Sequence, residues 1–237
     1  MIKSCDSKTQ TKKDGEPKRT LYFLVLASCI LLSSETAAYA QTIRVVSEAK
    51  YKSVRIDSQV WMTENLNVDA FRNADRIPNA ESVEEWISAG KDGKPAWCYY
   101  ENKGENGVKY GRLYNWFAIN DPRGLAPAGW HVPSDTEWSM ATLFLGGEDA
   151  AGTKMKTPTG WSHDGNGTNE SGFSCLPSGS RDRFGKFDYA GHVTYWWCST
   201  AHDAEFAWYR IIDESPHYVY RTHFHKQNGY SVRCIHD

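Results

Sequence analysis

Residues 110–138 constrain the fold of this chain more than any other stretch. Leu113, Trp116 and Phe117 recur at the i, i+3, i+4 spacing of a helix with one apolar face. Pro122 ends that pattern, because proline cannot continue a helix and forces the residue before it to be extended. The pattern predicts a short helix whose apolar face packs on the rest of the domain.

A second helix is predicted to begin at a capping box. Ser134 and Glu137 have the spacing at which each side chain satisfies an otherwise unpaired backbone N–H of the other residue. The residues that this helix turns inward are Trp138, Ala141 and Leu145, and it is expected to end at Gly146 and Gly147. The rest of the domain has the pattern of short strands and loops, so the sequence predicts an α+β fold with two short helices.

The first forty residues have the pattern of an export signal. Basic residues, among them Lys12, Lys13, Lys18 and Arg19, precede the apolar run 21–32, which is too short to span a bilayer. Small residues at Ala38 and Ala40 then offer a signal-peptidase site that leaves Gln41 as the first residue. An alternative is a lipobox ending at Cys29, which would attach the protein to a membrane through a lipid.

Either processing route places the body of the chain outside the cytoplasm, secreted or on the outer cell surface. We divide the 237 residues into a signal peptide (1–40), a lead-in segment (41–53) and one domain (54–237). Segment 1–40 holds 6 basic and 4 acidic residues, so the formal charge of −2 for the whole chain becomes −4 without it. With this charge balance we expect no basic patch that would attract nucleic acid. A membrane contact is expected only through the lipid anchor.

Four cysteines remain beyond the signal: Cys98, Cys175, Cys198 and Cys234. An even number in an exported chain favours disulfide bonds over a metal site. None of them has the Cys-x-x-Cys spacing of a zinc ribbon. Four cysteines allow three pairings, and the spacing does not choose among them.

Six blocks of sequence resemble one known family. They are QVWMTENLN (59–67), YGRLYNW (110–116), GWHVPSD (129–135), GFS (172–174), YWW (195–197) and GYSVRC (229–234). In this order they look like the Fibrobacter succinogenes major paralogous domain, which is found in exported bacterial proteins. The resemblance implies a C-type-lectin-like fold: two helices on a small twisted antiparallel sheet, adjacent N- and C-terminal strands, and long loops. It implies no established biochemical activity.

The chain departs from the family pattern at two cysteines. Cys175 stands where the family usually has a small residue, and Cys198 stands where it usually has serine. Their joint occurrence suggests a Cys175–Cys198 bond, which leaves Cys98 to pair with Cys234. This nested pairing also resembles that of lectin-like domains.

The aromatic content favours a glycan ligand. Sugar rings stack on flat aromatic faces, and neighbouring Asn and His side chains can bind the hydroxyls. The candidate ligand-binding residues are Trp161, Asn166, Asn169, Tyr189, Tyr218, Tyr220 and His223. The competing interpretation is that a fold rich in loops needs large side chains in its core. It is favoured for the tryptophans of the ordered blocks, namely Trp61, Trp116, Trp130, Trp138, Trp196 and Trp197.

Neither of two possible metal sites is complete in the sequence. Segment 164–170 is rich in oxygen ligands suited to calcium, but the sugar-binding motifs of calcium-dependent lectins are absent. His223 and His225 would share one face of a strand with His217 and Arg221, without an obvious carboxylate. We therefore predict no metal and no cofactor, with calcium as the alternative.

One segment resembles part of an enzyme family. Residues 228–234 are similar to the end of formylglycine-generating enzymes, which hold copper with two closely spaced cysteines. Only Cys234 is present in this segment. No Gly-x-Ser-x-Gly, His-Glu-x-x-His or phosphate-binding loop occurs in the chain. The sequence therefore predicts no catalytic residues.

We expect an exported, non-catalytic module that binds a glycan or a surface protein. The binding loops are expected at 160–172, 178–194, 201–206 and 213–227, because loops on a stiff scaffold commonly carry recognition. The alternatives are an oxidase-like enzyme and a purely structural envelope protein.

Overall fold

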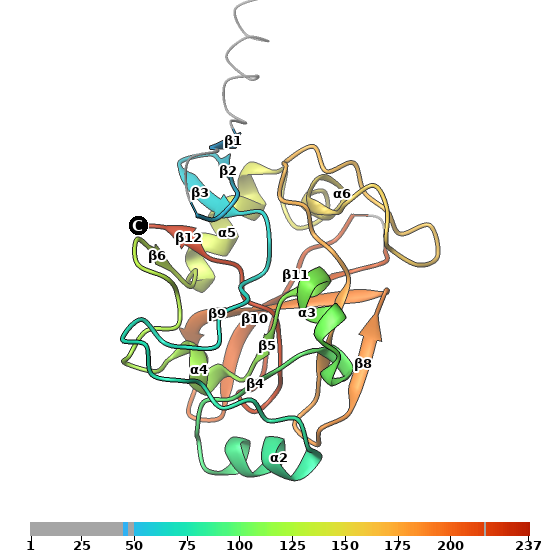
Figure 1. Cartoon of the computed structure of the whole chain (residues 1–237). Helices are drawn as coiled ribbons and strands as arrows, with labels where there is room; N and C mark the ends of the chain where they lie inside the picture. Colours follow the sequence, from blue (N-terminus) through green and yellow to red (C-terminus); the bar gives the residue numbers. More distant parts are fainter. Residues whose placement is uncertain (1–44, 47–49, 216) are drawn as a thin grey trace, which may run out of the picture. The chain divides into compact units, whose positions relative to one another are not determined.

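The computed structural model describes residues 45–46, 50–215 and 217–237, and the predicted signal peptide lies outside them. Within these residues the fold is α+β, with the helices between residues 83 and 155 and strands before, among and after them (Figure 1). The helical elements are α2 (Val83–Lys91), the 3-10 turn η1 (Tyr100–Asn102), α3 (Gly104–Tyr110), α4 (Trp116–Ile119), α5 (Asp135–Phe144) and α6 (Ala151–Met155).

One five-stranded sheet joins the two ends of the domain. Its order is β1 (Val45–Val46), β2 (Ser53–Ile56), β3 (Gln59–Met62), β12 (Ile235–His236) and β6 (Trp130–His131). Strand β12 lies antiparallel between β3 and β6, with Ile235 opposite Trp61 on one side and His131 on the other. The predicted adjacency of the N- and C-terminal strands is therefore confirmed.

A second five-stranded sheet has the order β11 (Tyr220–His225), β10 (Phe206–Asp213), β9 (Val193–Ala201), β7 (Ser178–Arg181) and β8 (Phe187–Ala190). Strands β9, β10 and β11 form an antiparallel meander, whereas β7 pairs with β9 in parallel. In the sequence, segments 206–212, 217–225 and 230–235 have the pattern of three antiparallel strands, which predicts that 230–235 is the last strand of this meander. That segment instead crosses to the first sheet, making only isolated bridges at Tyr230 and Ser231 on the way.

The structure corrects the prediction of the first helix. Leu113 belongs to the two-residue strand β5 (Leu113–Tyr114), which pairs with β4 (Trp97–Cys98). The helix is the single turn α4, which begins at Asn115, whose side chain accepts from the Ala118 N–H. A helix N-cap therefore stands where periodicity alone predicted helix interior.

Helix α5 forms as predicted. Ser134 and Glu137 make both hydrogen bonds of the capping box, and Gly146 and Gly147 have positive φ angles of 109° and 92° after its end. Residues 101–109 have the composition of a charged turn and residues 178–191 that of a loop, yet they contain most of α3 and the hairpin β7–β8. These segments lack an apolar period that would mark the elements in the sequence.

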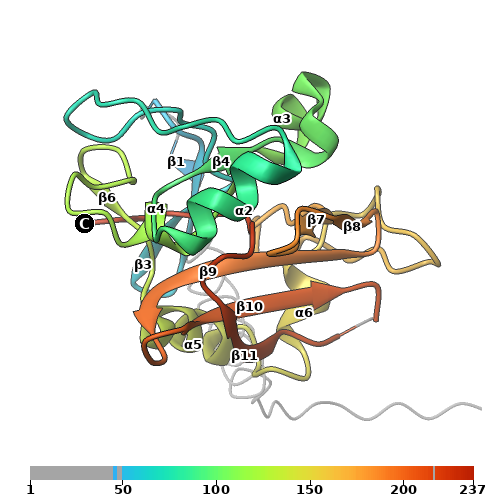
Figure 2. The ribbon, with the colours of Figure 1, turned by 90° about the horizontal axis from the view of Figure 1, so that it is seen from below.

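The two faces of the meander pack against different layers. Figure 2 shows α5 on one side of β9 and β10, and α2 and α4 on the other. On the α5 side, the rings of Trp61, Trp138, Phe173 and Trp196 lie with centroids 4.6–5.8 Å apart. The tryptophans of the ordered blocks are at most 4% exposed, which confirms that they form the core. We call the two five-stranded sheets, α5 and the segment 229–234 that crosses between the sheets the frame.

The cysteines differ from the sequence prediction, because all four are free and buried. Cys98 lies in a cluster with Trp86, and Cys234 lies in a separate cluster with Trp130. Cys175 and Cys198 share the cluster of α5 without being bonded. In this structure neither the Cys98–Cys234 nor the Cys175–Cys198 bond is formed, and each thiol packs as a small apolar side chain.

Among the residues that the structure describes, no helix has both the length and the apolar character needed to span a membrane.

Buried arginines donate hydrogen bonds to polar groups in the interior of the domain. Arg181, Arg210 and Arg233 are each 1% exposed. Arg233 alone donates to the carbonyls of Met62 and Phe173 and to the side chain of Asn65.

Candidate functional site

Three loops that are distant in sequence meet beside the second sheet. The Ser162 N–H donates to the Gly191 carbonyl at 2.8 Å, which joins loop 160–172 to the turn between β8 and β9. A Cβ on Gly165 would lie 2.6 Å from the carbonyl oxygen of Glu214, so this close approach requires glycine. We call segments 160–172, 189–192, 213–215 and 217–220 together the loop end, which includes the bordering ends of β8, β10 and β11.

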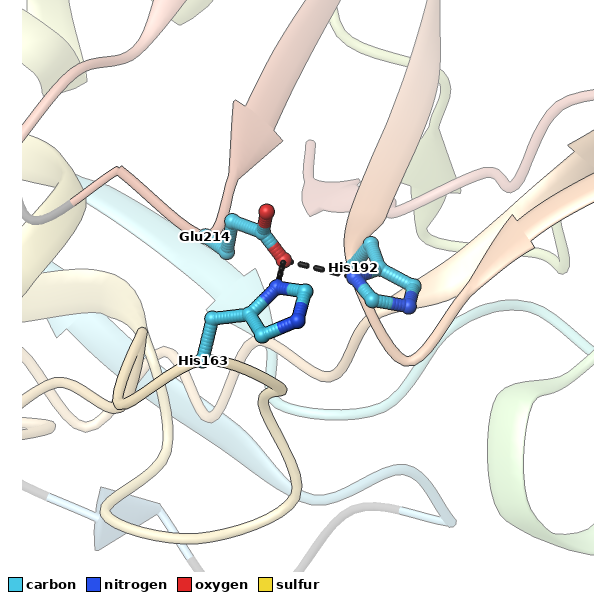
Figure 3. A group of neighbouring side chains, drawn as sticks. All are labelled: His163, His192 and Glu214. Carbon is cyan, nitrogen blue, oxygen red and sulfur yellow. Dashed lines mark hydrogen bonds and ion pairs between the residues drawn. The ribbon is translucent and has the colours of Figure 1, made fainter.

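The loop end brings His163, His192 and Glu214 together (Figure 3). The Nδ1 atoms of His163 and His192 lie 3.0 Å and 2.6 Å from the same Glu214 carboxylate oxygen. One potential metal-binding atom from each of these residues lies within 4.8 Å of the other two. Hydrogen bonds from the two imidazoles, that of His192 first, hold the pKa of Glu214 below its usual range. The group is therefore a carboxylate shared by two imidazoles.

Lys156 fixes the segment that carries Glu214. Its side chain is fully buried, and its ammonium donates to the carbonyls of Asp213 at 3.2 Å and Ser215 at 2.6 Å. These carbonyls flank Glu214, so the lysine sets the direction in which the carboxylate leaves the chain. Burial lowers the pKa of Lys156, and the ring of Trp161 lies 5.1 Å from its ammonium.

The backbone at the loop end adopts conformations that non-glycine residues rarely take. His163 and Asp164 have φ angles of 49° and 57°, and Tyr189 has φ of 71°. Each such conformation costs on the order of 1 kcal/mol and persists where the surrounding structure imposes it. At the loop end the strain lies on a member of the cluster, His163, and next to the turn that carries His192.

Three of the predicted ligand-binding residues instead hold loop 160–172 together. Trp161 is only 5% exposed, and its indole N–H donates to the Cys175 carbonyl. The side-chain oxygen of Asn166 accepts from the Trp161 N–H, and that of Asn169 accepts from the Ser174 N–H. The expected binding role of Trp161 is therefore corrected to a core role. The amide oxygens of 164–170 that favoured calcium are likewise already used within the loop.

The predicted tyrosines are exposed. Tyr218 and Tyr220 are 41% and 39% exposed, and their rings stack with centroids 5.4 Å apart and planes 24° from parallel. Tyr189 is 58% exposed, and its carbonyl accepts from the His192 N–H, so it adjoins the histidine cluster. These three tyrosines are available to a ligand.

His223 lies away from the loop end. Its ring stacks on that of His202 with centroids 3.7 Å apart, next to Trp208. His225 contacts Arg183, and His217 contacts the hydroxyl of Thr153. The metal site considered for His217, His223 and His225 is therefore not assembled among the described residues.

Sequence reasoning missed His163, His192 and Glu214. They are separated by 29 and 22 residues, and each stands alone in a polar loop with no second ligand at a metal-binding spacing. The one usable signal was that each lies in a different loop among those predicted to form the binding surface. Their meeting depends on the fold.

Comparison with known proteins gives one match. The sequence model described as Fibrobacter succinogenes major domain matches residues 54–236, more than half of the chain. No curated protein and no solved structure matches.

Proposed function

The chain belongs to the Fibrobacter succinogenes major domain family, and we propose that it is an exported, non-catalytic module that binds glycans at its loop end. The single observation that carries this proposal is the exposed stacked pair of Tyr218 and Tyr220 on a segment anchored to the frame. Two nearly parallel rings held outward offer a flat apolar surface to a sugar ring at little cost in side-chain entropy.

The fold supports a lectin-like interpretation of this module. Strands β3 and β12 close the domain at its two ends, α5 covers one face of the meander, and the loops project from the frame. The anchoring of the tyrosine segment is specific: the Val219 N–H donates to the Glu148 carbonyl, and the Gly152 N–H donates to the His217 carbonyl. Recognition loops held in this way lose little conformational freedom on binding.

The oxidase-like alternative needs a reactive thiolate at Cys234. That side chain is fully buried, and burial raises its pKa to about 12, so it stays a protonated thiol near neutral pH. A thiol titration of the protein beginning at Gln41 separates the two functions. We expect no reaction in the folded protein and reaction of all four cysteines after unfolding. A rapidly reacting Cys234 in the folded protein would favour the enzyme.

Export rests on the predicted signal within residues 1–40 and is tested by locating the mature protein. Cell fractionation with sequencing of the first residues should find Gln41 as the N-terminus and the protein in the medium or on the outer surface. A lipid-modified Cys29 at the N-terminus would place the same domain on a membrane anchor instead.

A glycan array probed with the protein beginning at Gln41 tests the ligand class. We expect binding that the Tyr218→Ala/Tyr220→Ala variant loses. Phe184→Ala is the matched control, since Phe184 is an aromatic residue that is 64% exposed outside the loop end. An array on which wild type binds nothing would reject the glycan and favour a surface protein or a purely structural role in the envelope.

A further inference from the structure

The cluster of His163, His192 and Glu214 has the composition of a transition-metal site. Two imidazole nitrogens and one carboxylate oxygen form a common three-ligand set for zinc. Imidazole nitrogen is a poor ligand for calcium and magnesium, which take oxygen ligands. The chemistry of the cluster therefore selects Zn²⁺ and related first-row cations.

The spacing of the three side chains is close to what zinc requires. Bonds of about 2.1 Å in a tetrahedron place neighbouring ligand atoms about 3.4 Å apart. The two nitrogen–oxygen separations are 3.0 Å and 2.6 Å, and all three ligand atoms lie within 4.8 Å of one another. An ion is accommodated by a small outward movement of the imidazoles, each of which gives up its Nδ1 hydrogen bond and carries its proton on Nε2.

The site is also organised before any ion arrives. Lys156 holds the carbonyls on both sides of Glu214, and Gly165 allows the loop of His163 to touch the Glu214 backbone. The hydrogen bond from the Ser162 N–H to the Gly191 carbonyl fixes the third loop, the turn that carries His192. Three ligands on three separate loops are thus brought together by contacts that leave their nitrogen and carboxylate ligand atoms free of this work.

One side of the cluster faces solvent. The side chain of His163 is 72% exposed, and those of His192 and Glu214 are 39% and 34% exposed. A tetrahedral ion bound by three protein atoms keeps its fourth position for water or an external ligand. Figure 3 shows the three side chains converging from different loops, and the group found among the described residues has these three members.

We propose that His163 Nδ1, His192 Nδ1 and the Glu214 carboxylate bind one Zn²⁺, whose fourth position accepts an oxygen of the ligand. The ion joins the three loops of the loop end. The second half of this proposal, the ligand oxygen, rests on the proposed glycan-binding function. The first half, zinc binding, does not.

The test of zinc binding uses calorimetric titration of ZnCl₂ into chelator-treated protein without glycan. We expect one ion per chain and a rise in Tm on saturation. Glu214→Gln and His192→Ala should weaken binding by more than the roughly 10–100-fold that loss of an outer-shell partner causes. His217→Ala and His202→Ala are matched controls, because these histidines lie outside the cluster, and they should bind zinc as wild type does.

Two results would overturn the zinc site: no stoichiometric binding by wild type, or equal binding by Glu214→Gln and His192→Ala. Circular dichroism of each variant checks that the fold is retained, so that lost affinity reports on the ligand set. A Co²⁺-loaded protein gives an independent signature, since its visible absorption distinguishes four-coordinate from six-coordinate binding. Absorption of the six-coordinate aqueous type would contradict the proposed geometry.

Repeating the glycan array with and without zinc separates the two proposals. Glycan binding that chelation abolishes and zinc restores supports both. Glycan binding that is unchanged by chelation refutes the proposal that the ligand oxygen occupies the fourth position of the zinc ion, and it leaves the glycan-binding function supported. An array that stays blank although zinc binds in the calorimeter refutes the glycan module and leaves the zinc site intact.

Discussion

The frame and the loop end use polar side chains in opposite ways. In the frame, Arg233 is 1% exposed, and its guanidinium donates hydrogen bonds to two backbone carbonyls and to the Asn65 side-chain oxygen. At the loop end, His163 and Glu214 contact one another while much of each side chain remains in solvent. A buried polar group that has its partners within the fold stabilises the fold. A convergent polar group that is open to solvent remains available to a ligand.

The largest effect is expected where the frame depends on a buried cation. Arg233→Met leaves the carbonyls of Met62 and Phe173 buried without their donor, which should lower the free energy of unfolding by about 3–5 kcal/mol. Urea denaturation measures this change. Arg233→Lys is the control that retains the charge without the planar fork, and it should recover only part of the loss. If Arg233→Met were as stable as wild type, the buried polar groups of the frame would not stabilise the fold, and the contrast with the loop end would be lost.

A moderate effect is expected at the start of α5. Ser134→Ala deletes the hydroxyl that accepts from the Glu137 N–H, and loss of such a cap costs about 1 kcal/mol. Ser134→Thr retains the hydroxyl and should stay close to wild type. Thermal unfolding of the two variants side by side gives the comparison, and equal Tm values would show that the cap contributes nothing.

A smaller, pH-dependent effect is expected at His131. Burial alone would lower its pKa, but hydrogen bonds to Glu137 and Asp237 raise it above the usual value of about 6.5. A raised folded pKa stabilises the protein fully below the unfolded pKa, and this contribution is lost as the pH rises through the folded pKa. His131→Gln should therefore destabilise the protein more at about pH 5.5 than at about pH 8.5. Urea midpoints at the two pH values measure the difference, and the opposite order would contradict the sign.

The smallest effect on stability is expected at the loop end. Tyr218→Ala removes a ring that is 41% exposed, so the free energy of unfolding should change by no more than about 0.5 kcal/mol. The same denaturation experiment measures it. A loss comparable to that of Ser134→Ala would mean that this tyrosine belongs to the frame and would weaken its assignment as a binding residue.

Local signals in the sequence predicted the elements that depend on neighbouring residues. The capping box at Ser134 and Glu137 forms as expected, because both partners lie within one turn. The burial of the block tryptophans was predicted for a similar reason: apolar residues in an ordered run have few alternatives to the core.

Predictions failed where distant segments compete for a residue. Leu113 continued a helical period, yet pairing with Cys98 places it in a strand. Segment 230–235 had the pattern of a meander strand, yet the first sheet takes its end through Ile235. The expected disulfide pairs depended on which thiols meet in space: Cys98 and Cys234 lie in separate clusters, and Cys175 and Cys198 share a cluster as free thiols. In each case the deciding contact lies far along the chain, where spacing carries no information.

By itself, the sequence determined the family, the α+β composition, the capped helix and the loops on which a binding surface would lie. Only the tertiary structure decided that His163, His192 and Glu214 share one point in space and that Trp161 is buried. The physical reason is range. Caps and periodic apolar faces are settled within a few residues, whereas a site assembled from three loops exists only once the frame has fixed where those loops begin and end.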